Sequence, residues 1–395
     1  MNRVEELIQQ LCPNGVEWKK LGEVCDYERP TKYIVKSTNY NPQFQTPVLT
    51  AGQSFVLGYT DEAYGIYKAN TQHPVIIFDD FTTSFQWVDF DFKVKSSAIK
   101  ILIPSCESVL LRFVYYLMQT IHFEAVEHTR YWISRYSQIE IPVPPLSIQQ
   151  EIVRILDTFT ELTANLQTEL DARKKQYVYY RDCLLNFEGV DGVEWKKLGE
   201  VLRSIRTGLN PRTFFKLNTP DAGSYYVTIR EFSNGKLKFT SITDKINEKA
   251  RVLCNNRSNL ELDDVLFSGT GTIGETYVIN QEPLNWNIKE GVYALKPIKT
   301  IILPQYLQYI LSQSNIKSKY LKLADGGTVK SISMKKLNDF SIPIPPLPEQ
   351  RRIVAILDHF ETLVNDLSVG LPAELEARRK QYEYYRDKLL TFDRV

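Results

Sequence analysis

A glycine-rich segment is the first candidate for chemistry in this sequence. Residues Gly269 to Gly274 spell GTGTIG after a plausible strand, which is the spacing that cradles a pyrophosphate in dinucleotide-binding proteins. That chemistry needs the turn to open a helix whose N-terminus faces the phosphates. Here ETYVIN follows, with the pattern of another strand, and no strand–helix–strand unit surrounds the segment. We therefore expect a hairpin, or a loop whose backbone can approach a ligand closely.

Other catalytic patterns are missing from the printed sequence. It contains no GxxxxGK(S/T) loop for nucleotide hydrolysis, no GxSxG nucleophile elbow, no Asn/Asp-Pro-Pro-aromatic motif of amino-methyltransferases and no convincing acidic-x-Lys nuclease cluster. Asp79 and Asp80 form an acidic pair at a strand end, but no ExK follows, so we interpret them as turn residues rather than metal ligands. The five cysteines are scattered and never spaced as CxxC, which favours reduced thiols and no metal site.

Polar loop residues offer a different chemistry, the binding of a nucleic acid. In the second half of the chain, Ser268, Thr270 and Thr272 and the run GGTVKS at 326–331 supply hydroxyls, backbone amides and a lysine for phosphates or base edges. The candidates in that run are Gly327, Thr328 and Lys330. The counterpart in the first half is HTRYWIS at 128–134, in which Arg130 could bind a phosphate or a guanine edge. Tyr131 and Trp132 could stack on bases or fill the core.

The charge distribution supports nucleic-acid binding by two segments of the second half of the chain. The net charge is only +1, yet residues 203–257 hold 11 basic residues, among them Arg206 and Arg212, against four acidic ones. Residues 317–336 add six lysines against Asp325. Such an excess is typical of phosphate-backbone contact, although a solvated basic face has the same composition. Residues 17–143 hold 12 basic and 14 acidic residues, so a DNA-binding first half must concentrate its positive charge locally.

The chain repeats itself, which indicates how these loops are positioned. GVEWKKLGEV occurs at 15–24 and again, with ten identical residues, at 192–201. The segments 141–159 and 342–360 match closely, as do 173–187 and 378–392. A period near 200 residues indicates domain duplication rather than a solenoid. The residues after each GVEWKKLGEV share almost nothing, as expected of one frame that presents two different recognition surfaces.

The local patterns predict two α+β domains. β-branched runs at 74–78, 98–103, 264–268 and 292–297 are typical of strands, and amphipathic stretches at 109–119 and 304–313 indicate one helix in each domain. The N-terminal MNRVEELIQQL resembles a short amphipathic helix rather than a signal peptide, and no run approaches the ~20 apolar residues of a membrane span. We expect a cytoplasmic protein with no membrane partner.

A long helix follows the Pro-Pro-Leu motif of each repeat. Apolar residues recur at steps of four and three, the pattern of a coiled-coil seam. The seam positions are Ile152, Ile155, Phe159, Leu162, Tyr177, Tyr180 and Leu184 in the first helix, and Ile353, Ile356, Phe360, Leu363, Tyr382, Tyr385 and Leu389 in the second. About 40 residues make a rod of roughly 60 Å. Four residues are inserted near 368–375, and Gly370 and Pro372 should kink or break the second helix there. We expect the two helices to pair antiparallel.

The order of these motifs resembles the specificity subunit of Type I restriction-modification systems, over essentially the whole chain. The resemblance rests on GVEWKKLGEV, a variable domain, IPxPPLxxQxxIVxILDxF, a helix and RKQYxYYRDxLLxF, all stated twice. It implies a pseudo-two-fold α+β protein with a target-recognition domain at 1–145, a spacer helix at 146–187, a second recognition domain at 188–345 and a second spacer helix at 346–395.

The resemblance also implies a function. Each domain of such a subunit recognises one half of a bipartite double-stranded DNA target, and the helices set the gap. Two methyltransferase subunits dock, and restriction subunits add cleavage; S-adenosylmethionine, ATP and Mg would belong to those partners, and no cofactor to this chain. A fused methyltransferase or nuclease is the alternative enzyme, but the catalytic motifs are missing. A purely structural coiled-coil scaffold leaves the basic and divergent domains unexplained.

Overall fold

The computed structural model describes residues 1–395 except 1, 53, 126–128, 234, 328 and 366–369. The chain divides into two compact units, each described here by itself: unit 1 holds residues 1–167 and 374–395, and unit 2 holds residues 168–373. Among the described residues, no helix combines the length and the apolar composition that crossing a membrane requires.

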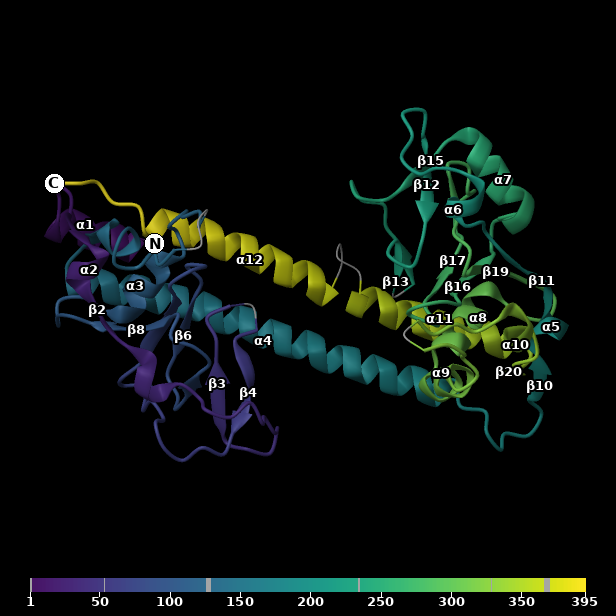
Figure 1. Ribbon diagram of the computed structural model, residues 1–395, viewed down its shortest axis with the longest axis horizontal. Helices are drawn as coiled ribbons and strands as arrows, with labels where there is room; N and C mark the ends of the chain where they lie inside the picture. Colours follow the sequence, from purple (N-terminus) through teal and green to yellow (C-terminus); the bar gives the residue numbers. More distant parts are fainter. Residues whose placement is uncertain (1, 53, 126–128, 234, 328, 366–369) are drawn as a thin grey trace. The chain divides into compact units, whose positions relative to one another are not determined.

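Unit 1 contains a sheet-rich domain and parts of two long helices (Figure 1). Its elements are α1 (Asn2–Leu11), β1 (Glu17–Lys20), α2 (Leu21–Val24), β2 (Cys25–Glu28), η1 (Pro30–Tyr33), β3 (Thr46–Leu49), β4 (Val56–Thr60), β5 (Val75–Asp79), β6 (Phe85–Val88), β7 (Lys93–Val94), β8 (Ile99–Pro104), α3 (Leu111–Met118), η2 (Tyr136–Gln138), β9 (Glu140–Val143), the first part of α4 (Leu146–Leu184) and most of α12 (Gly370–Leu389).

The central sheet of unit 1 is antiparallel with the order β2-β8-β5-β6, and its two faces have different neighbours. Ile76, Phe78 and Leu102 face a core that includes α3 and the start of α4. Ile77 and Ile101 face the opposite core, with strands β3 and β7 of the smaller sheet β4-β3-β7. This alternation follows from the two-residue period of a strand, so a β-branched run with no polar position is buried on both faces.

Unit 2 repeats this plan with additions. Its elements are the end of α4, β10 (Glu194–Lys197), α5 (Leu198–Val201), β11 (Leu202–Thr207), α6 (Pro211–Phe214), β12 (Ser224–Val227), β13 (Phe232–Ser233), β14 (Lys236–Leu237), β15 (Lys245–Ile246), α7 (Glu248–Ser258), β16 (Val265–Ser268), β17 (Thr276–Val278), β18 (Trp286–Ile288), β19 (Val292–Pro297), α8 (Pro304–Ser312), α9 (Ser314–Leu321), α10 (Met334–Asn338), β20 (Ser341–Ile344), α11 (Leu347–Asn365) and the start of α12.

The sheet of unit 2 has the order β11-β19-β16-β17, which is the order of unit 1 in corresponding strands. Val265, Phe267 and Leu295 lie in the core with α8 and α11, whereas Leu266 and Ala294 face the core with β12 and β18. In each unit the repeated GVEWKKLGEV forms a strand that pairs antiparallel with the strand before the Pro-Pro motif, β1 with β9 and β10 with β20. The sequence-based prediction of an α+β class, and of the strands and helices within it, is confirmed.

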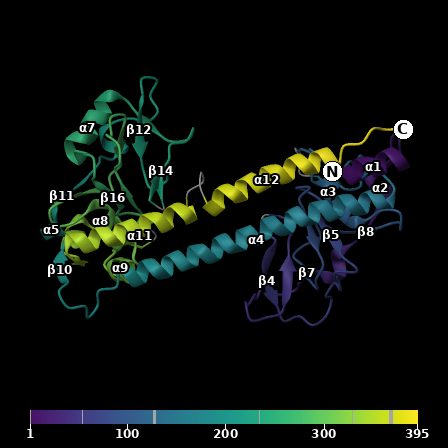
Figure 2. The same cartoon turned by 180° about the vertical axis from the view of Figure 1, so that it is seen from behind.

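The long helices pair within each unit (Figures 1 and 2). In unit 1 the ring of Phe159 stacks on Tyr385 with centroids 5.5 Å apart, and Gln167 accepts a hydrogen bond from Arg379, so α4 and α12 run antiparallel. Two helices, α11 and α12, stand where the sequence predicts one helix with a break. Pro372 lies in the first turn of α12, where a proline is tolerated, and residues 366–369 lie outside the described ones.

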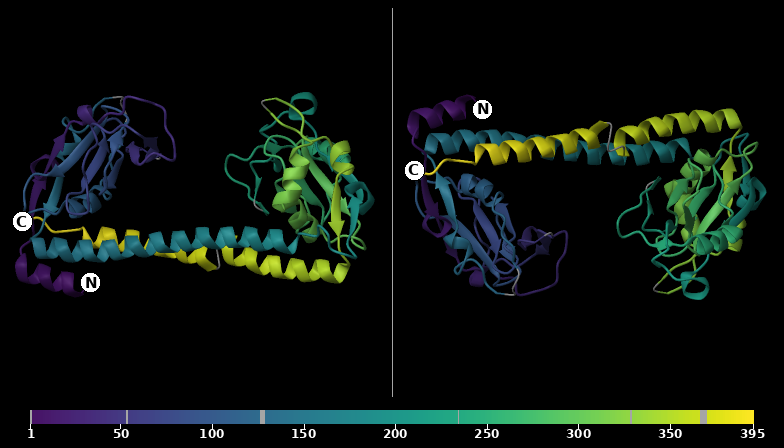
Figure 3. Two further views of the ribbon diagram at one scale, coloured as in Figure 1. Left: turned by 90° about the horizontal axis from the view of Figure 1, so that it is seen from below. Right: turned by 90° about the horizontal axis from the view of Figure 1, so that it is seen from above.

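The C-terminus of the chain packs beside its N-terminal segment in unit 1 (Figure 3). The amide of Val16 donates to the carbonyl of Asp393 at 2.9 Å, and Val16 and Arg394 form a parallel bridge. Helix α1 adds Val4 to the same core that holds Leu389 and Leu390 of the helix end. The residues that follow α12 are therefore joined by hydrogen bonds to Val16, which immediately precedes β1.

Candidate nucleic-acid interface

Two loops that the sequence singles out independently meet in unit 2. The β16–β17 turn and the loop before α10 form a short ladder, in which the amide of Gly271 donates to the carbonyl of Lys330 at 2.9 Å. The amide of Ile332 donates to the carbonyl of Gly269, also at 2.9 Å. The GTGTIG segment is thus the turn of an antiparallel hairpin, as expected, and it opens no helix.

The predicted contact residues of this ladder divide into exposed and buried ones. Thr270, Thr272, Gly327 and Lys330 are exposed. Ser268 is buried: its hydroxyl donates to the carbonyl of Thr272 at 2.6 Å and accepts from the amide of Glu275 at 2.8 Å, which closes the turn. Ser268 therefore shapes the loop, and a direct contact by its side chain stays a prediction. Thr328 lies outside the described residues.

The basic excess of unit 2 is partly neutralised within the fold. Carboxylates form ion pairs with four of its arginines, Arg203, Arg230, Arg251 and Arg257. The predicted contacts Arg206, on β11, and Arg212, on α6, are exposed and form no ion pair within the described part of the chain. A guanidinium that is not paired with a carboxylate of its own chain can bind a phosphate without first breaking an ion pair.

A cavity of about 330 Å³ adjoins the ladder. It brings to this site residues that were not among the contacts predicted from the sequence. Its lining includes Thr270, Arg230 and Lys289. Gly291 has φ +91°, and a Cβ there would meet the Thr270 hydroxyl at 2.8 Å, so the loop packs this closely only around glycine. Neither Arg230 nor Lys289 lies in a motif, and only the folded strand order places them beside Thr270.

The corresponding region of unit 1 presents fewer of the predicted residues. Arg130 is exposed, with its guanidinium 5.9 Å from the ring centre of Phe81. Tyr131 and Trp132 are buried, and both of their amides donate to Asp80, at its carbonyl and its Oδ1. Trp132 fills the core. Tyr131 would have to leave the core to stack on a base, so this placement does not favour its predicted contact.

The acidic pair at the end of β5 has a structural role. Oδ1 of Asp79 accepts hydrogen bonds from the amides of Phe81 and Thr82, both at 2.9 Å, which is turn chemistry as expected. Asp80 and Lys100 are buried together, with Nζ and Oδ2 3.4 Å apart. Across the described residues, no group of three or more His, Cys, Asp or Glu side chains is placed to hold a metal ion.

The predicted helix seam combines two different faces. Ile152 and Leu156 are fully buried in a core that α4 shares with the domain of unit 1 and with the end of α12. Phe159 faces Tyr385 of α12, while Leu162 is 39% exposed. The other seam residues of this unit pack on or within the same core: Ile155, Tyr382, Tyr385 and Leu389.

Unit 2 shows the same division. Ile353 and Leu357 are buried in the domain core, and Tyr180 stacks on Phe360 with centroids 6.0 Å apart. Leu363 is 41% exposed. The remaining predicted seam residues are partly buried, namely Tyr177, Leu184 and Ile356.

One buried glutamine fastens each domain to its helix, which explains why PPLxxQ occurs twice. Gln149 accepts a hydrogen bond from the amide of Leu110 at 2.9 Å and donates to the carbonyls of Ser108 and Pro144 at 3.0 and 2.8 Å. Gln350 makes the same three contacts, accepting from Leu303 and donating to Ile301 and Pro345. A primary amide satisfies one donor and two acceptors at once, which no apolar residue can do.

A tyrosine hydroxyl makes a second attachment, and here the units differ. In unit 1, Tyr116 donates to Asp157 at 2.5 Å, and Arg112 also binds that carboxylate. In unit 2, the Tyr309 hydroxyl lies 2.6 Å from an oxygen of Asp358 and 2.8 Å from an oxygen of Glu361, and it can donate its single proton to one of them at a time.

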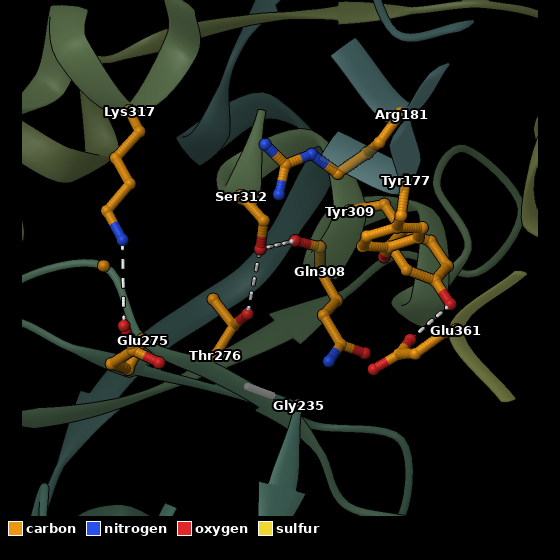
Figure 4. A pocket seen from close by; sticks show the side chains of 11 residues that line it. Tyr177, Arg181, Gly235, Glu275, Thr276, Gln308, Tyr309, Ser312, Lys317 and Glu361 are labelled. Carbon is orange, nitrogen blue, oxygen red and sulfur yellow. Dashed lines mark hydrogen bonds and ion pairs between the residues drawn. The ribbon is translucent and has the colours of Figure 1, made fainter. Parts of the chain in front are cut away.

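Figure 4 shows Tyr309 and Glu361 at one side of a cavity of about 140 Å³. Burial, with the nearby Asp358 charge, raises the pKa of the Glu361 carboxyl. This carboxyl is therefore easier to protonate than an exposed glutamate.

Comparisons with known proteins place this geometry in context. The sequence model of the family described as "Type I restriction modification DNA specificity domain" matches residues 13–172 and 191–377. The chain is 43% identical, over 99% of its length and 97% of the relative's, to the Type I restriction enzyme EcoR124I/EcoR124II specificity subunit of Escherichia coli. It is 32% identical, over 95% of its length and 96% of the relative's, to a putative Type I specificity subunit of Haemophilus influenzae.

Solved structures share the fold at lower sequence identity. The crystal structure of the Type I restriction-modification S subunit from M. genitalium covers 97% of this chain with a TM-score of 0.54 and 16% identity, and 98% of that chain is covered. A structure of a Type I restriction-modification system, described in terms of complex assembly and conformational transition, covers 96% of this chain and 98% of its own, with a TM-score of 0.58 and 21% identity.

Proposed function

The chain belongs to the specificity subunits of Type I restriction-modification systems, the non-catalytic components that give these complexes DNA specificity, and on this premise we propose that each unit recognises one half of a bipartite DNA target. The observation that carries the proposal is the shared strand order of the two central sheets, around which the loops differ. A common frame with divergent loops suits two independent half-sites. The proposed recognition domains are residues 1–145 and 188–345.

Most of the proposed DNA contacts lie where the turn after β5 or β16 meets the segment before the last strand of the domain. They are Arg130 in unit 1 and Thr270, Thr272, Gly327 and Lys330 in unit 2. Arg206 on β11 and Arg212 on α6 are further proposed contacts of unit 2. The basic members would bind phosphates, and the hydroxyls and amides would contact phosphates or base edges. Ser268 would act through the shape of its turn.

The paired helices would set the gap between the half-sites, with spacer segments at 146–187 and 346–395. An unbroken α4 of 39 residues supports this, because it corresponds to roughly 60 Å. Two methyltransferase subunits would dock on this chain, and restriction subunits would join them; these partners would supply the S-adenosylmethionine, ATP and Mg chemistry. Because the substrate is chromosomal DNA, we propose a cytoplasmic location.

Domain exchange tests the proposal. Residues 23–143 are replaced by the first recognition domain of another family member, and the complex with its methyltransferase subunits is used to methylate genomic DNA. Sequencing of the methylated sites should show one half of the motif changed and the other intact. A change in both halves would contradict independent recognition. The chain alone, incubated with S-adenosylmethionine and DNA, should bind DNA in a salt-sensitive way and transfer no methyl group.

A further inference from the structure

The fold explains much of the repeated GVEWKKLGEV segment. Leu21 and Val24, like Leu198 and Val201, are buried in the domain cores. Glu23 accepts a hydrogen bond from the amide of Lys20 at 3.1 Å and so caps a short helix, and its counterpart in unit 2 does the same at 2.8 Å. Gly22 and Gly199 also pack closely, because a Cβ there would lie 3.1 Å from the Cβ of Ser137 and 2.4 Å from the side chain of Asn338. These identities serve internal packing.

Three consecutive residues in each copy have no such explanation. We name Glu17, Trp18 and Lys19 the Trp patch of unit 1, and Glu194, Trp195 and Lys196 the Trp patch of unit 2. Trp195 is 42% exposed and Trp18 is partly exposed. The flanking ion pairs, Lys19–Glu17 at 3.2 Å and Lys196–Glu194 at 2.8 Å, are exposed in both units and contribute little stability.

Each indole also has a cation beside it, supplied by an unrelated part of the chain. The guanidinium of Arg394, in the C-terminal tail, lies 5.9 Å from the ring centre of Trp18. The ammonium of Lys319, on α9, lies 5.5 Å from the ring centre of Trp195. Each cation is held by a carboxylate, Glu140 for Arg394 at 2.7 Å and Glu188 for Lys319 at 2.6 Å. Both units therefore have a cation beside the identical tryptophan, although a different residue supplies it in each.

We infer that the two Trp patches are equivalent docking points for two copies of one protein partner, the methyltransferase subunit of the proposed function. This inference rests on that function. Identical exposed residues in units whose other loops diverge indicate a partner that is the same molecule at both places. A partly exposed tryptophan beside paired charges is typical of an interface hot spot, which combines a large apolar surface with a polar rim.

The charge balance favours a protein over DNA at these patches. In each one, the lysine is matched by a glutamate two residues away, and the cation beside the indole is matched by its own carboxylate. A polyanion would gain from uncompensated lysines and arginines, and it would be repelled by these glutamates. A folded protein surface with both signs of charge and an apolar group for the indole is the complementary occupant.

Stoichiometry provides the test. The full chain with Trp18→Ala, with Trp195→Ala or with both is mixed with the methyltransferase subunit of its own system, and the assemblies are measured by native mass spectrometry and by titration. Each single variant should bind one of the two copies at least about tenfold more weakly, and the double variant should bind both more weakly. Matched controls are Tyr64→Ala in unit 1 and Leu284→Ala in unit 2, which are 89% and 75% exposed and lie outside the repeats; they should bind two copies normally.

A charge-exchange variant distinguishes weaker binding from loss of folding. The pair Glu17→Lys with Lys19→Glu keeps the ion pair and the net charge, and it should still weaken one copy because the partner meets inverted charges. Folded variants, with unchanged circular dichroism and melting temperature, that bind two copies with wild-type affinity would overturn the inference. Weaker DNA binding with intact assembly would overturn it too and would assign the patches to DNA. A wild-type chain that binds no methyltransferase subunit would refute the proposed function itself and this inference with it.

Discussion

Replacing Gln149 with methionine tests whether the buried amide holds the first domain on its helix. Methionine matches the length of the side chain but removes the acceptor for the Leu110 amide and the donors for the Ser108 and Pro144 carbonyls. A buried group left without a partner costs about 1–3 kcal/mol. The hydrogen bond to Pro144 is buried, whereas those to Leu110 and Ser108 are part-buried, so water can reach these two groups in part. We therefore expect a net loss of about 2–4 kcal/mol.

This loss should be visible in thermal unfolding. For a unit of this size, 1 kcal/mol corresponds to about 2–4 °C, so the transition of unit 1 should fall by about 4–16 °C in differential scanning calorimetry. Gln150→Met is the matched control, because this neighbouring glutamine is exposed and its replacement should cost less than about 0.5 kcal/mol. Gln350→Met should reproduce the loss in unit 2. If Gln149→Met and Gln150→Met melt within about 2 °C of each other, the amide is not what attaches the domain.

Three further predictions concern the helices, the charge of unit 2 and the DNA contacts. Inserting four residues in register after Leu166 should lengthen the helix by about 6 Å and the gap of the methylated motif by one or two base pairs. A two-residue insertion should instead rotate the seam by about 200° and destabilise the protein. An active four-residue variant with an unchanged gap would show that the helices do not set the gap. Because the folded pKa of Glu361 is raised, the folded state holds its proton more tightly, so the stability of unit 2 should fall as pH rises above the ordinary glutamate pKa of 4.5 and through the folded pKa. Glu361→Gln should flatten this dependence in urea unfolding measured from pH 4 to 8, and an unchanged slope would contradict the burial argument. Lys330→Ala and Arg212→Ala should each reduce the salt slope of DNA binding by about one, measured by fluorescence anisotropy, and neither contacts phosphate if both slopes equal that of the wild type.

The periodicity of apolar residues predicts the strands and helices, because the sides on which each element is buried follow directly from where its apolar residues recur. The run at 74–78 has no polar position, and β5 is indeed buried on both faces of its sheet. The turn at Gly269 was predicted from its neighbours, since a following strand cannot be a phosphate-binding helix. These inferences used only residues close together in the sequence, whose local preferences agree with the fold.

The faces of the long helices could not be separated in this way. An apolar residue every three or four positions marks a buried stripe, but it does not say what covers the stripe. Ile152 is fully buried in a core that includes sheet residues of its own domain, whereas Phe159, seven residues later, stacks on Tyr385 of α12. Similarly, an aromatic residue such as Tyr131 suits a base stack or a core equally well, and only the fold shows that its side chain is buried. Long-range packing decides both cases.

The two attachments of domain to helix show what the duplication has kept and what it has changed. The buried glutamine is identical in both units because three backbone groups must be satisfied by one side chain, and few residues can do this. The tyrosine hydroxyl is also kept, yet the carboxylate it binds is neutralised by Arg112 in unit 1 and is joined by Glu361 in unit 2. The added arginine makes the site of unit 1 neutral, whereas the added glutamate makes the site of unit 2 more acidic. At these two attachments, identity is therefore confined to the groups whose geometry permits one solution. Where the geometry permits several, each unit has its own, so its response to pH and to mutation should differ from that of the other unit.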